Sequence, residues 1–192
     1  MASRAKTRAR STSRRSKNDA ISLLKRDHAA VRQLLKRFEQ TTEGATELRE
    51  TLLSELETEI KLHSRIEEEI FYPAFKEAAG NADEHLYFEA IEEHGLVDVV
   101  IPQLKRTAVS SEKFAAKAKV LKDLVEHHAE EEEAAMFPRA RQVISASQLR
   151  LLGSQMQARK EELKAGMLER VAVKAGSTLG KVLSFASGKR VA

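Results

Sequence analysis

Two stretches of the chain repeat one arrangement of histidine, glutamate and proline. HSRIEEEIFYP at residues 63–73 and HAEEEEAAMFP at residues 128–138 each begin with histidine. Each then has glutamate four positions later, an aromatic residue nine positions later and proline ten positions later. Residues four apart on a helix project from the same face on successive turns. Each stretch therefore predicts an imidazole beside a carboxylate, a pair of groups that suits a transition-metal ion.

Four segments with helical periodicity must position these pairs. Apolar residues in each segment recur at alternating spacings of three and four, as on a helix that buries one face. Short polar breaks separate the segments at about 41–46, 79–83 and 107–111. Pro102 is predicted to kink the end of the third helix, and Pro73 and Pro138 are predicted to end or kink theirs. The pattern predicts an all-α fold, an up-down-up-down antiparallel four-helix bundle.

One histidine in each segment shares the spacing of the apolar residues. These histidines are His28, His63, His94 and His128. His127 is rotated by about 100° from His128, and His85 lies about half a turn around the helix from His94, so both should face outward. A single inward histidine is usually an ordinary core residue. Four of them, with Glu67 and Glu132 on the same faces, would cost several kcal/mol of stability unless a bound cation compensated.

The ligand types restrict the metal. The chain has 192 residues and no cysteine, so disulfides, thiolate metal sites and iron–sulfur clusters are excluded. Four imidazole nitrogens and two carboxylates suit iron, manganese or zinc rather than calcium, and six ligands exceed the need of one tetrahedral zinc. If Glu67 and Glu132 each bridge two ions, up to two positions per ion stay open for a small molecule. The surplus glutamates are predicted to form a solvated face that helps to attract cations, and they are Glu68, Glu69, Glu130, Glu131 and Glu133.

Taken together, these residues resemble the haemerythrin-like, or HHE cation-binding, family of non-haem di-iron four-helix bundles. The likeness covers about residues 19–140. It consists of DH at 27–28, H-x-x-x-E at 63–67, EEH at 92–94, and H-x-x-x-E at 128–132 followed by FP. The resemblance implies two iron ions joined by an oxo or hydroxo bridge. It also implies that His28 and His63 bind one ion, that His94 and His128 bind the other, and that Glu67 and Glu132 bridge them.

The third segment departs from the oxygen-carrying members of that family. Those members place a further histidine one turn after the third-helix ligand, and here Asp98 stands at that spacing. Either Asp98 is a weaker, anionic ligand or the position is open to water. An open site favours reactions with peroxide, dioxygen or nitric oxide, or iron handling, over reversible oxygen carriage. Ferritin-like Glu-x-x-His and protease-like H-E-x-x-H spacings do not occur in the sequence.

The two ends of the chain differ in charge from its body. Residues 1–17 have seven Lys or Arg and residues 171–192 have four, with no acid in either stretch, which leaves 22 bases against 29 acids between them. The predicted organisation is a disordered basic arm at 1–17, the bundle at 18–145, a C-terminal helix at 146–170 and a basic flexible tail at 171–192. The arm could bind nucleic acid weakly and without sequence preference through phosphates.

The sequence is compatible with two cellular locations and three classes of function. No apolar run is long enough to span a membrane, and the Arg-rich start lacks the apolar stretch of a secretory signal. A cytoplasmic protein is predicted, with an organelle transit peptide as the alternative. Three function classes fit: a redox-active di-iron protein that acts on a small oxidant, a sensor or iron-binding module that changes helix packing, and a nucleic-acid-associated structural protein with incidental histidines.

Overall fold

Residues 19–187 are described by this computed structural model, with side chains described as far as residue 170, and they form helices joined by short connections. The four long helices are α2 (Ala20–Glu39), α3 (Thr46–Ile66), α5 (Glu84–Lys105) and α6 (Glu112–Glu131), and the C-terminal helix is α8 (Ala146–Ser187). The shorter elements are α4 (Tyr72–Ala79), α7 (Phe137–Val143), a 3₁₀ turn at Gly80–Asp83, and π-helical turns at Glu67–Phe71 and Glu132–Met136. The prediction of an all-α fold with four long helices and a C-terminal helix is confirmed.

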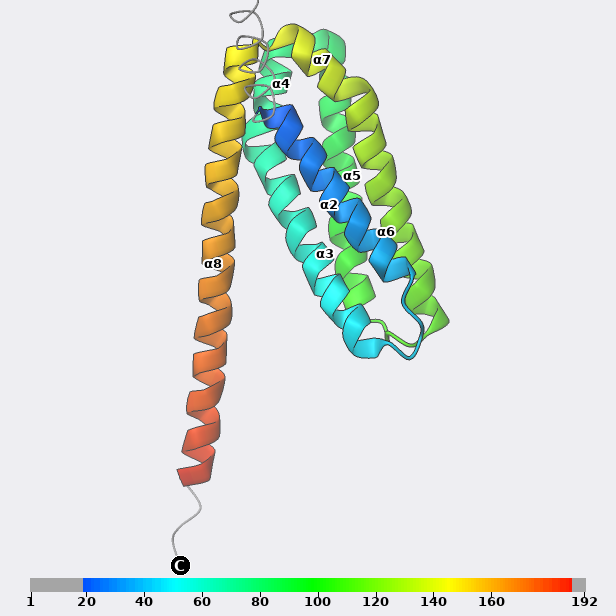
Figure 1. The fold of residues 1–192 in the computed structure, drawn as a ribbon, viewed down its shortest axis with the longest axis vertical. Coiled ribbons are helices and arrows are strands. Elements are labelled where there is room, and N and C mark those ends of the chain that lie inside the picture. Colours follow the sequence, from blue (N-terminus) through cyan, green and yellow to red (C-terminus); the bar gives the residue numbers. More distant parts are fainter. Residues whose placement is uncertain (1–18, 188–192) are drawn as a thin grey trace, which may run out of the picture.

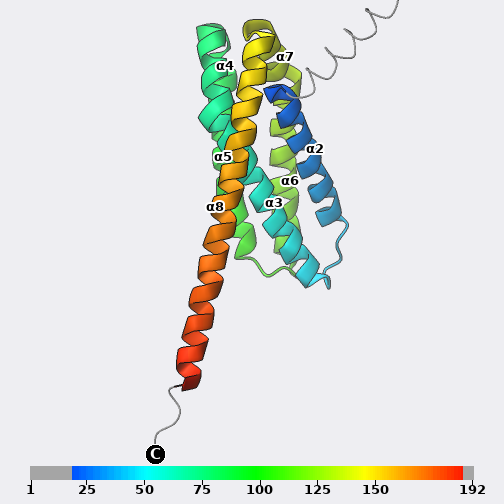
Figure 2. The same cartoon turned by 60° about the vertical axis from the view of Figure 1, so that its left-hand side comes forward.

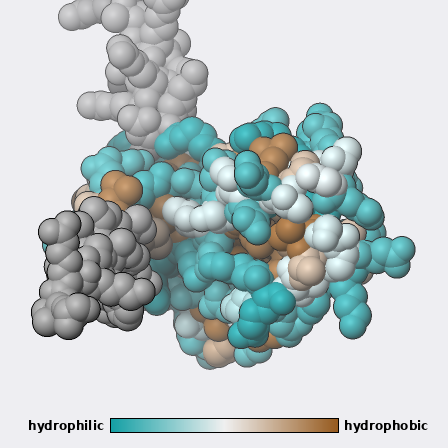
Figure 3. Space-filling view, turned by 90° about the horizontal axis from the view of Figure 1, so that it is seen from below, coloured by the Kyte–Doolittle hydropathy of each residue, from teal (hydrophilic) through white to brown (hydrophobic). Residues whose placement is uncertain are grey.

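The long helices lie side by side and their connections are gathered at the two ends (Figure 1). The loops that follow α2 and α5 lie at one end, whereas α4 and α7 lie at the other. Helix α8 starts at the α4–α7 end, packs against α2 and α3, and extends past the loops (Figures 1 and 2). Seen from the loop end, the surface of the bundle is mostly hydrophilic, with a smaller hydrophobic area near its centre (Figure 3).

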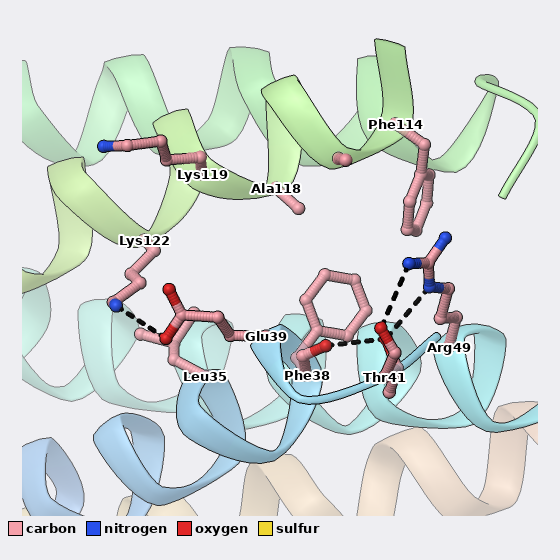
Figure 4. Close-up of a pocket in the computed structure, with 10 residues that line it drawn as sticks. Leu35, Phe38, Glu39, Thr41, Arg49, Phe114, Ala118, Lys119 and Lys122 are labelled. Carbon is pink, nitrogen blue, oxygen red and sulfur yellow. Dashed lines mark hydrogen bonds and ion pairs between the residues drawn. The ribbon is translucent and has the colours of Figure 1, made fainter. Parts of the chain in front are cut away.

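Helix starts and loops are fixed by hydrogen bonds of polar side chains. Asp19 caps α2 by accepting from the Ser22 amide at 2.8 Å, and Arg141 of α7 donates to the same carboxylate at 3.0 Å. At the loop end, Arg49 donates to the Thr41 hydroxyl at 2.9 Å and to the Val109 carbonyl at 2.6 Å. Arg49 thereby joins the loops after α2 and α5. Figure 4 shows this arginine beside a 210 Å³ cavity, which is lined in part by Phe38 and Phe114.

The apolar core is divided into two clusters by a layer of polar residues. The cluster near α4 and α7 includes Leu24 and Ile66, and the cluster near the loops includes Val31 and Ile60. On α2, His28 lies between Leu24 and Val31, and His63 lies between the corresponding residues of α3. The predicted seam histidines therefore occupy one layer at mid-height of the bundle, with apolar packing above and below it.

The prolines that follow the repeated motifs do not end the helices. Pro73 and Pro138 lie in the first turns of α4 and α7, directly after the two π-helical turns. A first turn tolerates proline because its N–H groups lack intrahelical partners anyway. Each helix therefore continues past its proline after a local change of register. Pro102 lies inside α5, which continues to Lys105.

Helix α8 continues past residue 170, where the sequence predicted its end, and through Ser187. The stretch 171–187, predicted as a flexible tail, is helical. No proline occurs after Pro138, so no local barrier ends this helix at 170. The basic arm at 1–17 and the last five residues lie outside the described part of the chain. None of the helices within residues 19–187 has both the length and the apolar character that crossing a membrane requires.

Candidate metal centre

The six residues singled out by the sequence lie together in the polar layer. They come from all four long helices and the two π-helical turns, and they are His28, His63, Glu67, His94, His128 and Glu132. All six are buried, with exposed fractions between 0 and 6 %. The prediction that these side chains point into the bundle is therefore correct.

The histidines are arranged as two pairs. His28 and His63, termed the first half-site, place their Nε2 atoms 3.0 Å apart. His94 and His128, termed the second half-site, place theirs 3.1 Å apart. This is the pairing that the resemblance implied.

Two carboxylates connect the half-sites. Glu67 Oε2 lies 3.2 Å from His63 Nε2 and 3.5 Å from His94 Nε2. Glu132 Oε2 lies 3.2 Å from His28 Nε2 and 3.8 Å from His128 Nε2. Each glutamate thus contacts one histidine of each pair. Ligand atoms of His28, His63, Glu67 and Glu132 all lie within 4.8 Å of one another, and so do those of Glu67, His94 and His128.

The outer nitrogen, Nδ1, of each of the four buried histidines faces a further carboxylate. The Nδ1 atoms of His28, His94 and His128 lie 3.0, 2.9 and 2.7 Å from Glu133, Glu68 and Glu93, and Nδ1 of His63 lies 3.7 Å from Asp27. An ionised carboxylate only accepts hydrogen bonds, so in a neutral imidazole Nδ1 carries the proton and Nε2 keeps its lone pair. Carboxylates in this position orient metal-binding histidines and increase their basicity.

This arrangement explains why the centre needs a cation. When both imidazoles of a pair are neutral and carry the proton on Nδ1, their Nε2 lone pairs face one another, with the Nε2 atoms 3.0 and 3.1 Å apart in the two pairs. Among the described residues, Glu67 and Glu132 both have two buried carboxylate oxygens without a hydrogen bond. Such groups are costly in an apolar interior, and a metal ion would accept electron pairs from the nitrogens and the oxygens together. The residues present therefore fit a bound cation.

Burial and neighbouring charges also shift the protonation equilibria. Burial and the adjacent Glu132 raise the pKa of Glu67 well above its usual range. Burial would raise the pKa of Glu132 too, but contacts with His28 and the charge of His128 lower it to about 2. The pKa of His63 is lowered to about 4, chiefly by burial, so its imidazole is neutral at pH 7, as a metal ligand must be.

Tyr72 belongs to the centre but was not singled out as a site residue. Its hydroxyl lies 3.4 Å from His94 Nε2, and its side chain is fully buried. Burial and the charges of Glu132 and Glu67 raise the pKa of Tyr72 well above its usual range, so the phenol stays protonated. The sequence signal for it was the aromatic residue that follows the histidine of each repeat by nine positions. Its counterpart Phe137 stacks on His28 with ring centroids 5.7 Å apart.

Two small cavities adjoin the centre and differ in lining. One has a volume of about 30 Å³ and is lined by all four ligand histidines and by apolar residues including Val31, Val97 and Val125. The other, of about 10 Å³, is lined by His128, Glu132 and the acidic residues Glu93 and Glu131. The centre therefore has an apolar side and an acidic side.

Other site predictions had mixed outcomes. Asp98 is exposed and belongs to neither ligand cluster, because Val97 takes the buried position after His94. His85 and His127 are exposed, as predicted. Glu68 and Glu133 were assigned to a solvated face, but they contact ligand histidines. Their position in the sequence could have indicated this role, because each directly follows a glutamate that was predicted to bridge two ions.

Comparison with known proteins places the chain in a family. The model of the hemerythrin HHE cation binding domain matches residues 19–140. Uncharacterised proteins of Mycobacterium tuberculosis (Rv2633c) and Mycobacterium bovis are both 30% identical over 166 residues, which is 86% of this chain and 99% of theirs. The crystal structure of an HHE cation binding domain-containing protein from Mycobacterium kansasii, an Rv2633c homologue, is 31% identical with a TM-score of 0.71, covering 81% of this chain and 93% of that one. The chain belongs to the hemerythrin HHE cation-binding family, and its buried histidines and glutamates are the groups with which a member of that family would bind metal.

Proposed function

We propose that the protein binds two iron ions, one at each half-site, and uses them to react with a small oxidant such as peroxide, dioxygen or nitric oxide. His28 and His63 would bind one ion, His94 and His128 the other, and Glu67 and Glu132 would bridge them alongside an oxo or hydroxo group. The observation that carries this proposal is the presence of two ligand clusters that share Glu67. Manganese or zinc would suit the same nitrogen and oxygen donors.

The surroundings of the centre favour a small, neutral reactant. Iron bound there would supply redox and Lewis-acid chemistry. The 30 Å³ cavity can hold a molecule about the size of one or two waters, and its apolar lining favours uncharged molecules. Tyr72 keeps its proton and can donate a hydrogen bond beside His94. Reactants as large as an organic hydroperoxide do not fit this space without displacing side chains.

Metal analysis combined with a turnover assay tests this function. Purified, iron-loaded protein should contain about two irons per chain, show an oxo-bridge charge-transfer band and consume hydrogen peroxide. His128→Ala should abolish peroxide consumption, whereas His85→Ala, which changes an exposed histidine on α5, should not. An iron-loaded protein that is inert to peroxide, dioxygen and nitric oxide would exclude this function.

One contact favours a sensor as the second candidate. Lys160 of α8 lies 2.8 Å from the Asp27 carboxylate, and Asp27 faces His63 Nδ1 at 3.7 Å. A change in metal or ligand at the first half-site could thus alter the packing of α8. Limited proteolysis of the metal-free and iron-loaded forms would then cut α8 at different rates. Equal rates would argue against this alternative.

The proposal also includes the order of the helices, the cellular location and the binding of nucleic acid. We infer an up-down-up-down order for the four long helices, supported by the two loops at one end of the bundle. A cytoplasmic location stays a prediction. Weak nucleic-acid binding also stays a prediction, because it depends on residues 1–17. Deleting these residues should remove any salt-dependent binding to DNA without changing the metal content.

A further inference from the structure

A second, exposed group of metal-ligating side chains lies next to the centre. His127 Nε2 is 3.6 Å from Glu93 Oε1 and 3.4 Å from Glu131 Oε1. Ligand atoms of these three residues lie within 4.8 Å of one another, as they do in the buried clusters. An imidazole and two carboxylates are suitable ligands for a divalent transition-metal ion.

This surface group is connected to the centre by the acidic cavity. Glu93 and Glu131 line that cavity together with the buried ligands His128 and Glu132. Glu132 is 2 % exposed, and its oxygens accept no hydrogen bond from any described residue. A buried carboxylate without a hydrogen bond therefore lines the same cavity as Glu93 and Glu131, two members of the surface group.

Exposure decreases stepwise along this path. The exposed fractions of the His127, Glu131 and Glu93 side chains are 62, 45 and 16 %. Glu93 belongs to both groups, because its Oε1 faces His127 while its Oε2 lies 2.7 Å from His128 Nδ1. An ion that exchanged its water ligands for protein ligands along this order would be desolvated gradually, which avoids the cost of burying a bare charge in one step.

The charges around the two cavities favour this path for a cation. None of the described residues that line the acidic cavity is Lys or Arg, and four of them are glutamates. The apolar cavity, in contrast, has no Asp or Glu among its described lining residues, and its lining includes Arg32, which is paired with Glu133 at 2.7 Å. A volume of about 10 Å³ is close to the space of a single water molecule, so the cavity has room for one ion that has exchanged its water ligands for protein ligands.

We propose that Glu93, His127 and Glu131 form an entry site for a divalent cation such as Fe²⁺, from which the ion passes along the acidic cavity to His128 and Glu132. This inference rests on the proposed metal-binding function of the centre. It assigns a role to His127, which lies next to the ligand His128 in the sequence but outside the centre.

Loading kinetics test the entry site separately from the centre. Metal-free protein is mixed with Fe²⁺ without oxygen, samples are quenched with a chelator at intervals, and the retained iron is measured. The His127→Ala/Glu131→Gln double variant should load about tenfold more slowly at limiting Fe²⁺ and reach the same final iron content, since a focused local field raises on-rates by at least this factor. The matched control, His85→Ala/Glu130→Gln, changes the same residue types at exposed positions outside the group.

Each result has a clear meaning. Equal loading rates in the double variant and its control would overturn the entry site while leaving the centre intact. A lower final iron content in the double variant would also overturn it, because the residues would then support the centre itself. If the unaltered protein retained no iron, the proposed function would fail, and the entry site with it. A second measurement is direct: protein with its centre filled by Zn²⁺ should bind one further Mn²⁺, detected by electron paramagnetic resonance, and the double variant should not.

Discussion

The two half-sites contain the same pair of ligand types but are enclosed differently. Behind the first half-site, Lys160 of α8 lies 2.8 Å from Asp27 and 3.2 Å from Glu59, so a helix outside the four-helix core covers this side. Behind the second half-site, His128 is held by Glu93, which also borders the acidic cavity. The second half-site also has the Tyr72 hydroxyl, whereas the first has the apolar ring of Phe137 against His28.

This difference indicates that two ions bound at the half-sites would have different roles, although the residue types that hold them are the same. The first ligand cluster contains four residues and the second contains three, and Glu132 Oε2 lies 3.2 Å from His28 Nε2 but 3.8 Å from His128 Nε2. The first half-site is therefore suited to hold an ion firmly. The second has fewer close ligands, a hydrogen-bond donor and a route to the surface, and it is suited to exchange ligands. Changes at matching positions should accordingly have unequal effects.

Removing the glutamate shared by both clusters should have the largest effect. Glu67→Ala removes a ligand from each half-site at once, so we expect iron content to fall from about two per chain to less than one. Elemental analysis of the purified variant after loading with excess Fe²⁺ measures this. Glu130→Ala, which changes an exposed glutamate of α6, should keep both ions. Retention of two irons by Glu67→Ala would mean that this carboxylate does not bridge the half-sites.

Removing one histidine from each pair should separate the half-sites. His63→Ala and His128→Ala should each retain about one iron, because each leaves the opposite pair complete. The difference should appear in reactivity. His128→Ala should lose peroxide consumption, while His63→Ala should keep a measurable fraction, since the second half-site still has Tyr72 and its ligands. Equal residual activity in the two variants would contradict the division of roles.

The sequence was sufficient to predict the buried layer of histidines and glutamates, for a physical reason. Periodicity reports which residues share a helix face, so four buried histidines and two buried glutamates could be placed without coordinates. The pairing of His28 with His63, and of His94 with His128, came only from the family resemblance. Periodicity along single helices does not say which helices face each other.

The groups that support the ligands were harder to predict, because they act across helices. Glu68 of the first π-helical turn faces His94 on α5, and Glu93 of α5 faces His128 on α6. On their own helices these residues look like part of a charged surface. The π-helical turns were missed as well, because a proline in sequence indicates a break without showing that the helix can continue in a new register. Each turn starts at one of the two buried glutamates, Glu67 or Glu132.

Replacing the carboxylates that face the Nδ1 atoms of the buried histidines should have a smaller effect on metal affinity, and the effect should be selective for one ion. Asp27→Asn removes the negative charge behind His63, and Glu68→Gln removes the one behind His94. Loss of such a carboxylate typically lowers metal affinity by about 10- to 100-fold. Competition with a chelator of known affinity should show that Asp27→Asn weakens the binding of one ion and Glu68→Gln the binding of the other.

The effect of Glu68→Gln should be larger. Glu68 lies 2.9 Å from His94 Nδ1, the distance of a formed hydrogen bond, whereas Asp27 lies 3.7 Å from His63 Nδ1. Equal effects on both ions would show that the half-sites are not independent.

The smallest effect should come from the one hydroxyl that distinguishes the half-sites. Tyr72→Phe keeps the buried ring and removes only the oxygen 3.4 Å from His94 Nε2. A hydrogen bond of this kind contributes about 0.5–1.5 kcal/mol, so we expect peroxide consumption to slow by roughly two- to tenfold while iron content stays at two per chain. Steady-state rates and metal analysis on the same samples measure both quantities. Tyr87→Phe changes the only other tyrosine of the chain, whose ring packs against that of Tyr72 with centroids 6.3 Å apart but whose hydroxyl has no contact with His94 among those described, so it should leave the rate unchanged. If both substitutions slowed the reaction equally, the effect would come from packing around α4 and α5. If Tyr72→Phe lost iron instead, the hydroxyl would be needed to hold the ion. The second half-site would then not be better suited to exchange ligands than the first.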